Sequence, residues 1–374
     1  MKKIKLLFIL ENLSSGGAEK VLVNLVNNMN FEQFDITVLT LFCDGQNADS
    51  LKKDIEYVSL KRKKFKGIRL FTKFFPKRLL YKHYIKTDKY DIVVAFMTGV
   101  PAFVASGAKS KKIAWLHGEF FKEKKIYNFG LKSVYKKFNA VVGVSDYVCK
   151  SFKKAIGSAI NPITVYNTND VAKIKELSIE DCPVAFKNNS PVICSVGRLV
   201  KEKAYDRLIN VAARLKKEGF DFNLVIVGDG EKRDELRKQV KNLNACKYIR
   251  FTGYDANPYK YLRQSDIFVC SSYTEGLSTA LTEAVILGLP CVSTNVSGAK
   301  EILGENNEYG IVTENSEQGI YVGLRKMLED ENIRRHYSQK ATERSVLFNT
   351  ENTVKQAEDL FKSLINNGAA FRVE

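Results

Sequence analysis

Two glutamates stand eight positions apart in SSYTEGLSTALTEAVILGLP, which spans residues 271–290. Glu283 lies four residues after Thr279, so in a helix the two share one face, where a carboxylate can accept paired hydrogen bonds from ribose hydroxyls. Glu275 precedes the predicted helix, on the side where a group attached to a bound phosphate would lie. We therefore expect Glu283 to hold a nucleoside and Glu275 to face a transferred group. The alternative is an exposed helical Glu283 and a Glu275 favoured only by the helix dipole.

An anion site is predicted where this helix begins. The pattern indicates a strand, a turn and then a helix that starts at Ser278 or Thr279. The first turn of such a helix has backbone N–H groups without helical partners, here from about Leu277 to Ala280, and these bind anions. Gly276 allows the backbone to come close to the anion. A phosphate is the expected occupant.

Two cations follow an earlier predicted strand in GRLVKEKAYDRL, residues 197–208. Arg198 and Lys203 are expected at the same end of the sheet as the anion site, where a guanidinium can clamp a diphosphate and an ammonium acts as a point charge. The chain contains no D-x-D pair that would bring a divalent ion to the phosphates. We therefore expect no metal and no other cofactor. Solvated loop charges without a role are the alternative.

The first half of the chain offers weaker signals. Gly16 and Gly17 close the first strand-to-helix loop but lack the full G-x-G-x-x-G spacing, so they indicate only a close approach of backbone to a phosphate or sugar. His117 ends a predicted strand just before Gly118, where it can donate a hydrogen bond to a sugar hydroxyl or an acceptor. A histidine that only packs is the alternative.

Alternating strands and helices predict an α/β protein with two doubly wound, Rossmann-like domains, each a parallel sheet covered by helices. The predicted strands are residues 3–10, 34–42, 91–97, 111–117 and 140–145, and then 192–197, 222–228, 248–253, 267–272, 290–294 and 310–313. We place the boundary in the polar stretch 178–191 and predict domains 1–180 and 181–374. The last helix, 353–366, could pack on either domain. Because open α/β sheets bind ligands beyond the carboxyl ends of their strands, a cleft between the domains is the expected site.

The net charge of +17 lies almost wholly in the first half. Residues 1–180 carry 32 Lys and Arg against 16 Asp and Glu, whereas residues 181–374 carry 27 against 26. Much of the excess lies in residues 61–86, which hold eleven basic side chains, no acidic one and interleaved aromatic and leucine residues. Such a segment can lie on an anionic membrane surface. RNA binding and an ordinary solvated face are the alternatives, but bulky apolar residues beside basic ones suit a membrane interface better, so we expect no nucleic-acid partner.

The remaining composition is that of a soluble globular protein, with 45% hydrophobic and 27% charged residues. No apolar run reaches the length of about 18 residues that spans a bilayer, and the first ten residues lack a signal-peptide cleavage site. Scattered cysteines without a C-x-x-C pair are interpreted as small core residues; they are Cys43, Cys149, Cys182, Cys194, Cys246, Cys270 and Cys291. We expect a cytoplasmic protein, peripheral on the inner face of the cell membrane.

With these motifs in this order, the chain resembles the retaining, nucleotide-sugar-dependent glycosyltransferases of family 4, whose GT-B fold has two facing Rossmann-like domains. Four motifs carry the resemblance over nearly the whole chain: SSGGAEK, SVGRLVKEK, FVCSSYTEGLSTALTEAVILGLP and VSGAKEIL. The third motif is the specific one, because of its spaced glutamates, whereas the GG loop is common.

The resemblance implies roles for the residues singled out above. Glu283 would bind the ribose, Glu275 would contact hydroxyls of the transferred sugar, and Arg198 and Lys203 would hold the diphosphate. His117 would lie near the sugar and the acceptor. The other implied donor-binding residues are Gly16, Gly17, Gly253, Tyr254, Gly276, Leu277, Ser278 and Thr279.

Some positions depart from the family pattern. Ala204 stands where many members have glycine, residues 166–170 (YNTND) replace the more usual N-G-x-D, and Leu277 and Ser278 stand where Phe-Gly is common. The loop with Leu277 and Ser278 is similar to the corresponding loops of polysaccharide and capsule assembly enzymes.

The implied reaction moves a sugar from a nucleoside diphosphate, with UDP expected, to a hydroxyl of a lipid-linked or polysaccharide acceptor in bacterial surface glycan synthesis, with retention of configuration. A sugar phosphorylase, which would need bound pyridoxal phosphate, or a nucleotide-sugar epimerase on the same scaffold is the enzymatic alternative. The second alternative is a non-enzymatic, basic membrane- or RNA-binding protein, which would show no nucleotide-dependent thermal shift.

Overall fold

The computed structural model describes residues 2–14, 16–42, 45–64, 66–120, 131–157, 160–184 and 190–366, and its contacts divide the chain into two compact units. The first unit runs to Asn169 and resumes at Thr350, and the second runs from Asp170 to Asn349. This division differs from the predicted boundary at residues 180 and 181, because helix α8 (Val171–Ser178) groups with the second unit. The last helix, which the sequence did not assign to a domain, groups with the first.

The first unit contains a parallel sheet of seven strands over its described residues, in the order β3-β2-β1-β4-β5-β6-β7. The strands are β1 (Ile4–Leu10), β2 (Phe34–Thr40), β3 (Glu56–Ser59), β4 (Ile92–Ala95), β5 (Lys111–Leu116), β6 (Ala140–Gly143) and β7 (Ile163–Thr164). Sequence analysis predicted five of them and missed β3 and β7. These two lie at the edges of the sheet, are short, and bury their side chains only in part.

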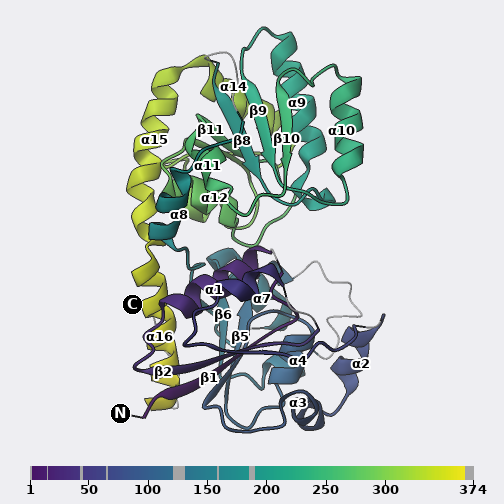
Figure 1. Cartoon of the computed structure of the whole chain (residues 1–374), viewed down its shortest axis with the longest axis vertical. Helices are drawn as coiled ribbons and strands as arrows, with labels where there is room; N and C mark the ends of the chain where they lie inside the picture. The colour runs from purple at the N-terminus through teal and green to yellow at the C-terminus, as the bar shows by residue number, and fades with distance from the viewer. Residues whose placement is uncertain are drawn as a thin grey trace. The chain divides into compact units, whose positions relative to one another are not determined.

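Helices cover both faces of this sheet (Figure 1). They are α1 (Gly17–Asn28), α2 (Ile68–Phe74), α3 (Lys77–Ile85), α4 (Val100–Ala105), α6 (Leu131–Tyr135), α7 (Asp146–Ile156) and α16 (Thr350–Asn366), with a short 3-10 helix at Gln46–Ser50. Helix α16 packs on the sheet through Phe361, whose ring centroid lies 6.0 Å from that of Phe8 in β1 and 6.1 Å from that of Phe34 in β2. The last helix thus completes a layer that the first 169 residues begin. In the described part of the chain, no helix combines the length and the apolar character needed to cross a bilayer.

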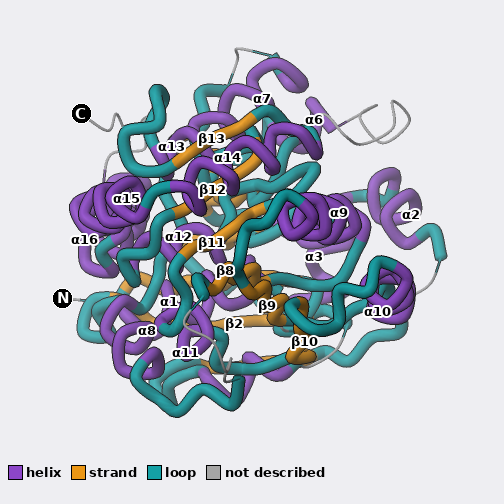
Figure 2. The backbone as a smooth tube through the Cα atoms, turned by 90° about the horizontal axis from the view of Figure 1, so that it is seen from above, coloured by secondary structure: helices purple, strands orange, loops and turns teal. Residues whose placement is uncertain are grey.

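The second unit contains a parallel sheet whose order is β10-β9-β8-β11-β12-β13, which Figure 2 shows from above. Its strands are β8 (Val192–Val196), β9 (Asn223–Val227), β10 (Ile249–Gly253), β11 (Ile267–Cys270), β12 (Cys291–Thr294) and β13 (Ile311–Thr313), all of them predicted. Its helices after α8 are α9 (Tyr205–Lys217), α10 (Arg233–Asn242), α11 (Tyr259–Arg263), α12 (Thr279–Ile286), α13 (Ala299–Leu303), α14 (Glu317–Glu329) and α15 (Glu331–Ser345), with 3-10 turns at Lys201–Lys203 and Val346–Phe348. The predicted fold class, α/β with two parallel-sheet domains, is confirmed.

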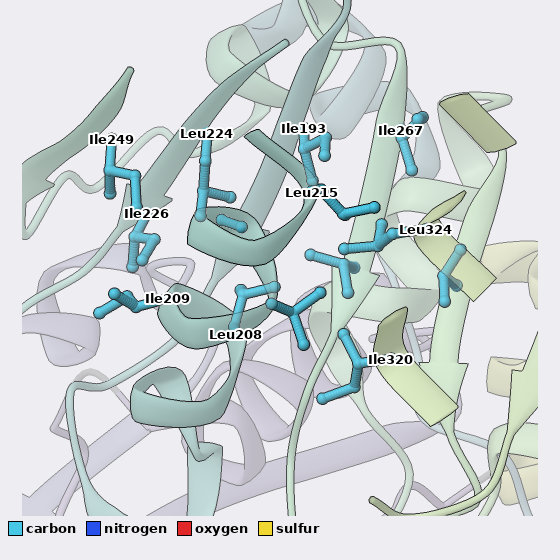
Figure 3. Packing of buried hydrophobic residues seen from close by; sticks show 14 of the residues in the cluster. Ile193, Leu208, Ile209, Leu215, Leu224, Ile226, Ile249, Ile267, Ile320 and Leu324 are labelled. Carbon is cyan, nitrogen blue, oxygen red and sulfur yellow. The ribbon is translucent and has the colours of Figure 1, made fainter. Parts of the chain in front are cut away.

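A single apolar cluster holds one helical layer on the second sheet (Figure 3). Leu208 and Leu215 of α9 belong to this cluster together with Ile193 of β8, Leu224 of β9 and Leu324 of α14. Helix α9 supplies these contacts because its apolar residues recur at helical spacing. This packing holds β8 in place, and the loop that carries Lys203 leaves the carboxyl end of this strand.

Each sheet reverses its strand order once, between β1 and β4 in the first unit and between β8 and β11 in the second. Right-handed crossovers on either side of this point lead in opposite directions, so the two loops that leave it diverge and leave room for a ligand. The loops after β8 and β11 are therefore the expected ligand-binding loops of the second unit.

The cysteine prediction holds in part. Among the described cysteines, Cys149, Cys194, Cys270 and Cys291 are buried and Cys182 is half-buried, but Cys246 is exposed. Cys43 lies outside the described residues, as do Ser15 of the first motif and Phe65 of the basic segment.

Candidate functional site

Lys203 and Glu275 meet at the carboxyl end of the second sheet. Lys203 belongs to the loop after β8 and Glu275 to the loop after β11, and Nζ of the lysine lies 2.7 Å from Oε1 of the glutamate. The two side chains are only 23% and 13% exposed. The Ser272 hydroxyl donates to the same carboxylate oxygen at 2.6 Å. The order of the strands thus brings together two predicted site residues that are 72 positions apart in the chain.

The pair keeps Lys203 charged. Burial by itself lowers the pKa of Lys203, but the Glu275 carboxylate offsets burial and raises the pKa above its ordinary value. The exposed Arg198 acts in the opposite sense, which shows that its guanidinium lies close enough to repel the ammonium. The predicted cations therefore share one region, and Lys203 balances the charge of Glu275.

The backbone around Lys203 explains two residue choices. Ala204 has a φ of +51°, in the left-handed region, which costs an L-residue about 1–2 kcal/mol. This left-handed conformation explains why the family resemblance leads us to expect a glycine at position 204. Gly197 leaves room for the lysine, since a Cβ at this position would lie 3.1 Å from Cε of Lys203 and 2.9 Å from the hydroxyl of Tyr205. A larger residue at position 197 would displace the lysine side chain.

Helix α12 begins at Thr279, as predicted. The Ser278 side chain caps it by accepting the N–H of Leu281 at 3.4 Å. Gly298, from the fourth motif, packs against the turn, because a Cβ there would lie 2.7 Å from Leu277 and 3.1 Å from the Gly276 carbonyl oxygen. The N-terminal turn of α12 is thus held beside the loop that carries Glu275.

Glu283 lies inside the second unit and not on its surface. It is 3% exposed, and the Tyr259 hydroxyl of α11 donates to its Oε1 at 3.2 Å. The alternative of an exposed helical glutamate is therefore wrong. Gly253 is the last residue of β10. It has a φ of +82°, and its carbonyl oxygen accepts the N–H of Gly228 at 2.9 Å. Tyr254 follows it, with 52% of its surface exposed.

Arg207 is a site residue that sequence reasoning missed. Its guanidinium is buried and donates to the Ser271 carbonyl, with Nε at 2.9 Å, and to the Ser272 carbonyl at 2.9 Å. It also donates to Oδ1 of Asn315 at 2.7 Å, and it stacks over the Tyr273 ring with a centroid distance of 4.2 Å. Because these contacts hold the residues that follow β11, Arg207 fixes the loop that carries Glu275.

The sequence does contain a signal for Arg207. It shares the apolar face of α9 with Leu208 and Val211, which are fully or almost fully buried. An arginine is almost never buried unless it has fixed partners. A cation inside an apolar helical stripe therefore indicates a structural or functional contact.

The other predicted residues belong to the first unit. Gly16 is the N-cap of α1 and Gly17 its first residue, and a Cβ on Gly16 would lie 2.2 Å from Oε2 of the buried Glu19. His117 follows β5, and its ring centroid lies 4.6 Å from that of Phe96. Burial lowers the pKa of His117 to about 3, so the imidazole is neutral at physiological pH. Its Nε2 atom is buried, and no partner for it is found among the described residues.

The second unit thus gathers Arg198, Lys203, Glu275 and the start of α12 at one edge of its sheet, with Glu283 one turn further along the helix. This arrangement offers cations and backbone amides to an anion, and carboxylates to hydroxyl groups. Over the residues that the structure describes, no group of three or more His, Cys, Asp or Glu side chains is placed to hold a metal ion.

Known protein families match both units of the chain, including the residues of the candidate site. Residues 15–171 match the family described as Glycosyltransferase Family 4, and residues 180–344 match Glycosyl transferases group 1. The Campylobacter jejuni N-acetylgalactosamine-N,N'-diacetylbacillosaminyl-diphospho-undecaprenol 4-alpha-N-acetylgalactosaminyltransferase is 30% identical over 96% of this chain and 99% of its own length. The amylovoran biosynthesis glycosyltransferase AmsD of Erwinia amylovora is 25% identical over 95% of this chain and 99% of its own. The crystal structure of Anabaena HepE in complex with UDP and glucose has a TM-score of 0.77 at 20% identity, covering 96% of this chain and 100% of HepE. The chain belongs to glycosyltransferase family 4 and has the GT-B fold.

Proposed function

We propose that this protein transfers a sugar from a UDP-sugar to a hydroxyl of a lipid-linked or polysaccharide acceptor in bacterial surface glycan synthesis, with retention of configuration. The observation that carries the proposal is the meeting of Lys203, Glu275 and the N-terminus of α12 at the carboxyl ends of β8 and β11. The names of similar proteins support it: the C. jejuni relative is named for a diphospho-undecaprenol acceptor, and HepE was crystallised with UDP and glucose.

The donor is held by the second unit. Glu283 accepts hydrogen bonds from the ribose hydroxyls, and the Tyr259 hydroxyl at 3.2 Å keeps its carboxylate in place. Arg198, Lys203 and the amides of the first turn of α12 bind the diphosphate. The loop at Gly253 and Tyr254 borders the base.

Catalysis relies on charge that develops as the glycosidic bond breaks. The departing β-phosphate gains negative charge, and Arg198 and Lys203 stabilise it because they are already in position. Losing one such donor costs about 3 kcal/mol, roughly a hundredfold in rate. Glu275, which Lys203 and Ser272 orient, binds hydroxyls of the transferred sugar. Since the fixed cations neutralise the phosphate, we expect transfer to continue when divalent ions are chelated.

Retention follows from attack on the face that the phosphate leaves, with the departing phosphate accepting the proton of the acceptor hydroxyl. His117, which is neutral at the working pH, contributes a hydrogen bond to the sugar or acceptor, and the backbone at Gly16 and Gly17 approaches the diphosphate. NMR assignment of the anomeric configuration of the product tests retention. A trapped glycosyl-enzyme adduct would contradict the same-face mechanism.

Residues 61–86 hold the protein on the inner face of the cell membrane. Four large apolar side chains of α2 and α3 are exposed in this segment: Leu70 at 43%, Phe71 at 54%, Phe74 at 65% and Leu79 at 57%. Exposed apolar residues among basic ones favour an anionic bilayer surface. Cosedimentation with phosphatidylglycerol vesicles measures this binding. Neutral substitutions of the basic residues should reduce it, and unchanged binding would rule out the segment as the membrane contact.

The central test is a thermal-shift screen against UDP, GDP and their sugars, followed by a transfer assay with the sugar that stabilises the protein. UDP should raise the melting temperature of the wild type, and Glu283→Ala should abolish the rise. Glu343→Ala, an exposed glutamate of α15, is the matched control and should respond as the wild type does. If no nucleotide stabilises the wild type, the proposed donor site is wrong.

A further inference from the structure

A buried asparagine stands where the loop after β10 joins helix α11. Asn257 is only 8% exposed, and it lies two residues before Tyr259, the first residue of α11. Its side-chain amide donates two hydrogen bonds through Nδ2 and accepts one through Oδ1. A buried amide with several fixed partners holds those partners in place. The donor site described above does not include Asn257.

The two hydrogen bonds that Asn257 donates reach the end of α8. Nδ2 lies 2.8 Å from the carbonyl oxygen of Leu177 and 2.8 Å from Oε2 of Glu180. Leu177 belongs to the last turn of α8, where backbone carbonyls have no partner within the helix. The second unit begins at Asp170, so α8 is its first helix. Asn257 therefore ties this helix to a loop that is 80 positions further along the chain.

The hydrogen bond that Asn257 accepts leads toward Glu283. Oδ1 accepts the backbone N–H of Tyr259 at 3.1 Å, in a turn where asparagine binds the backbone two residues on. Tyr259 is 3% exposed, and its hydroxyl donates to Oε1 of Glu283 at 3.2 Å. Because the turn fixes the backbone of Tyr259, it also fixes the direction from which the hydroxyl meets the carboxylate. Asn257 and Tyr259 thus connect the proposed ribose ligand to α8.

Asn257 also holds the loop that is assigned to the base. Oδ1 of Asp255 accepts the backbone N–H of Asn257 at 2.8 Å. Oδ2 of Asp255 accepts the Tyr261 hydroxyl at 2.9 Å and lies 3.0 Å from Nζ of Lys260. Burial by itself raises the pKa of Asp255, but these three donors offset burial and lower it. An ionised carboxylate with fixed donors therefore follows Tyr254 directly and keeps the loop in one conformation.

From these contacts we infer that Asn257 is a positioning residue of the nucleoside site, and that it makes donor binding selective for ribose over 2′-deoxyribose. It acts through Tyr259, whose hydroxyl sets where the Glu283 carboxylate meets the two ribose hydroxyls. A displaced carboxylate accepts from one hydroxyl but not from both, so a ribonucleotide loses affinity whereas a 2′-deoxyribonucleotide does not. The inference rests on the proposed function and names the feature of the donor that the site selects.

The test measures binding of UDP and 2′-deoxy-UDP to the full chain by calorimetric titration; GDP and 2′-deoxy-GDP replace them if GDP stabilises the wild type. The wild type should prefer the ribonucleotide by about 10- to 100-fold, the effect of one charge-assisted hydrogen bond. Asn257→Asp keeps the acceptor for the Tyr259 N–H but replaces both donors with an oxygen that faces Glu180. It should lower the preference by about 3- to 10-fold. Asn242→Asp, at an exposed asparagine of α10, is the matched control and should leave the preference unchanged.

Two combined variants test whether Asn257 acts through Tyr259. Tyr259→Phe removes the hydroxyl that contacts Glu283 and should lower the preference by itself. Combined with Asn257→Asp, it should lower the preference no further than the larger single loss, because both changes act on one chain of contacts. Multiplied losses would overturn the inference. Glu180→Gln combined with Asn257→Asp exchanges donor and acceptor, and it should restore part of the preference.

Other outcomes separate a structural role from the inferred one. Equal weakening of both nucleotides in Asn257→Asp, with the preference unchanged, would overturn the inference, as would a wild type that binds both nucleotides equally. A wild type that binds no nucleotide would contradict the proposed donor site itself. If Asn257→Asp does not fold, Glu180→Ala decides, because its exposed side chain accepts one of the two hydrogen bonds. Its preference should fall below that of Glu176→Ala, at an exposed glutamate of α8, and equal preferences would refute the inference.

Discussion

Lys203 has two tasks in the proposed site, and substitutions can separate them. It neutralises Glu275, and it holds the donor diphosphate. In Lys203→Met the first task fails because a carboxylate is left without its cation, and the second fails because the diphosphate loses a ligand. Adding Glu275→Gln removes the stranded carboxylate but does not restore the diphosphate ligand. The double variant should therefore regain stability without regaining activity.

The size of the stability effect follows from the burial of the pair. Removing one partner of a buried ion pair costs about 3–5 kcal/mol, whereas exposed pairs contribute about 0–1 kcal/mol. Here the side chains are 23% and 13% exposed and their charged atoms are 2.7 Å apart. We expect Lys203→Met to lower the free energy of unfolding by about 2–3 kcal/mol, between the ranges for exposed and buried pairs, because the two side chains are not fully buried. The double variant should lose less than the sum of the single variants, by about 1–2 kcal/mol.

The pH dependence of this coupling has a definite sign. The pKa of Lys203 is raised in the folded state, so the folded protein holds this proton more tightly than the unfolded chain does. The stabilisation is complete below the unfolded pKa of about 10.4 and is lost only as the pH rises through the folded pKa. The coupling energy should therefore be constant between about pH 6 and pH 9.

Urea unfolding followed by circular dichroism measures the three stabilities, and initial rates of sugar transfer measure the activities. Lys203→Met should lose about a hundredfold in kcat, and the double variant should stay at least as slow. An unchanged free energy of unfolding in Lys203→Met would mean that the ion pair does not form. Recovery of kcat in the double variant would show that Lys203 acts only by neutralising Glu275.

Three further outcomes are expected. Glu283→Gln should weaken UDP binding by about tenfold in calorimetric titration, because the ribose loses charge-assisted hydrogen bonds, and equal binding to wild type would remove Glu283 from the donor site. Arg207→Met should lower the free energy of unfolding in urea by about 2–4 kcal/mol, because the buried carbonyls of Ser271 and Ser272 lose their charged donor; a loss below about 1 kcal/mol would contradict that account. Since the folded pKa of His117 is about 3, the imidazole stabilises the fold fully above pH 6.5 and progressively less as the pH falls toward 3. The wild type should therefore lose about 2 kcal/mol more than His117→Gln between pH 7 and pH 5, and parallel pH profiles would mean that His117 titrates normally.

Local sequence patterns were sufficient to predict most of the strands and the start of helix α12. The strands of the second sheet are apolar runs bounded by turn residues, and α12 starts at the predicted Thr279 because Ser278 is a good cap. The missed strands, β3 and β7, lie at sheet edges and are only partly buried, so their sequences carry little of the apolar pattern that marks a strand.

The division of the chain into two units was harder to predict from the sequence, because it depends on tertiary packing. The polar stretch at residues 178–191 marked the join in the sequence, but α8 precedes that stretch and still groups with the second unit. Helix α16 groups with the first unit through the contacts of Phe361 with Phe8 and Phe34, residues more than three hundred positions away. No local pattern specifies such a pairing.

For the site, the sequence by itself determined the types of residue and their local placement: a glutamate before a capped helix, a second glutamate inside that helix, and cations directly after a strand. The tertiary structure alone decided that Lys203 and Glu275 form a pair, that Glu283 is buried beside Tyr259, and that Arg207 anchors the intervening loop. The reason is that β8 and β11 are neighbours in the sheet although β9 and β10 separate them in the chain. Spacing along a chain sets which side chains share a helix face, whereas the order of strands sets which loops meet.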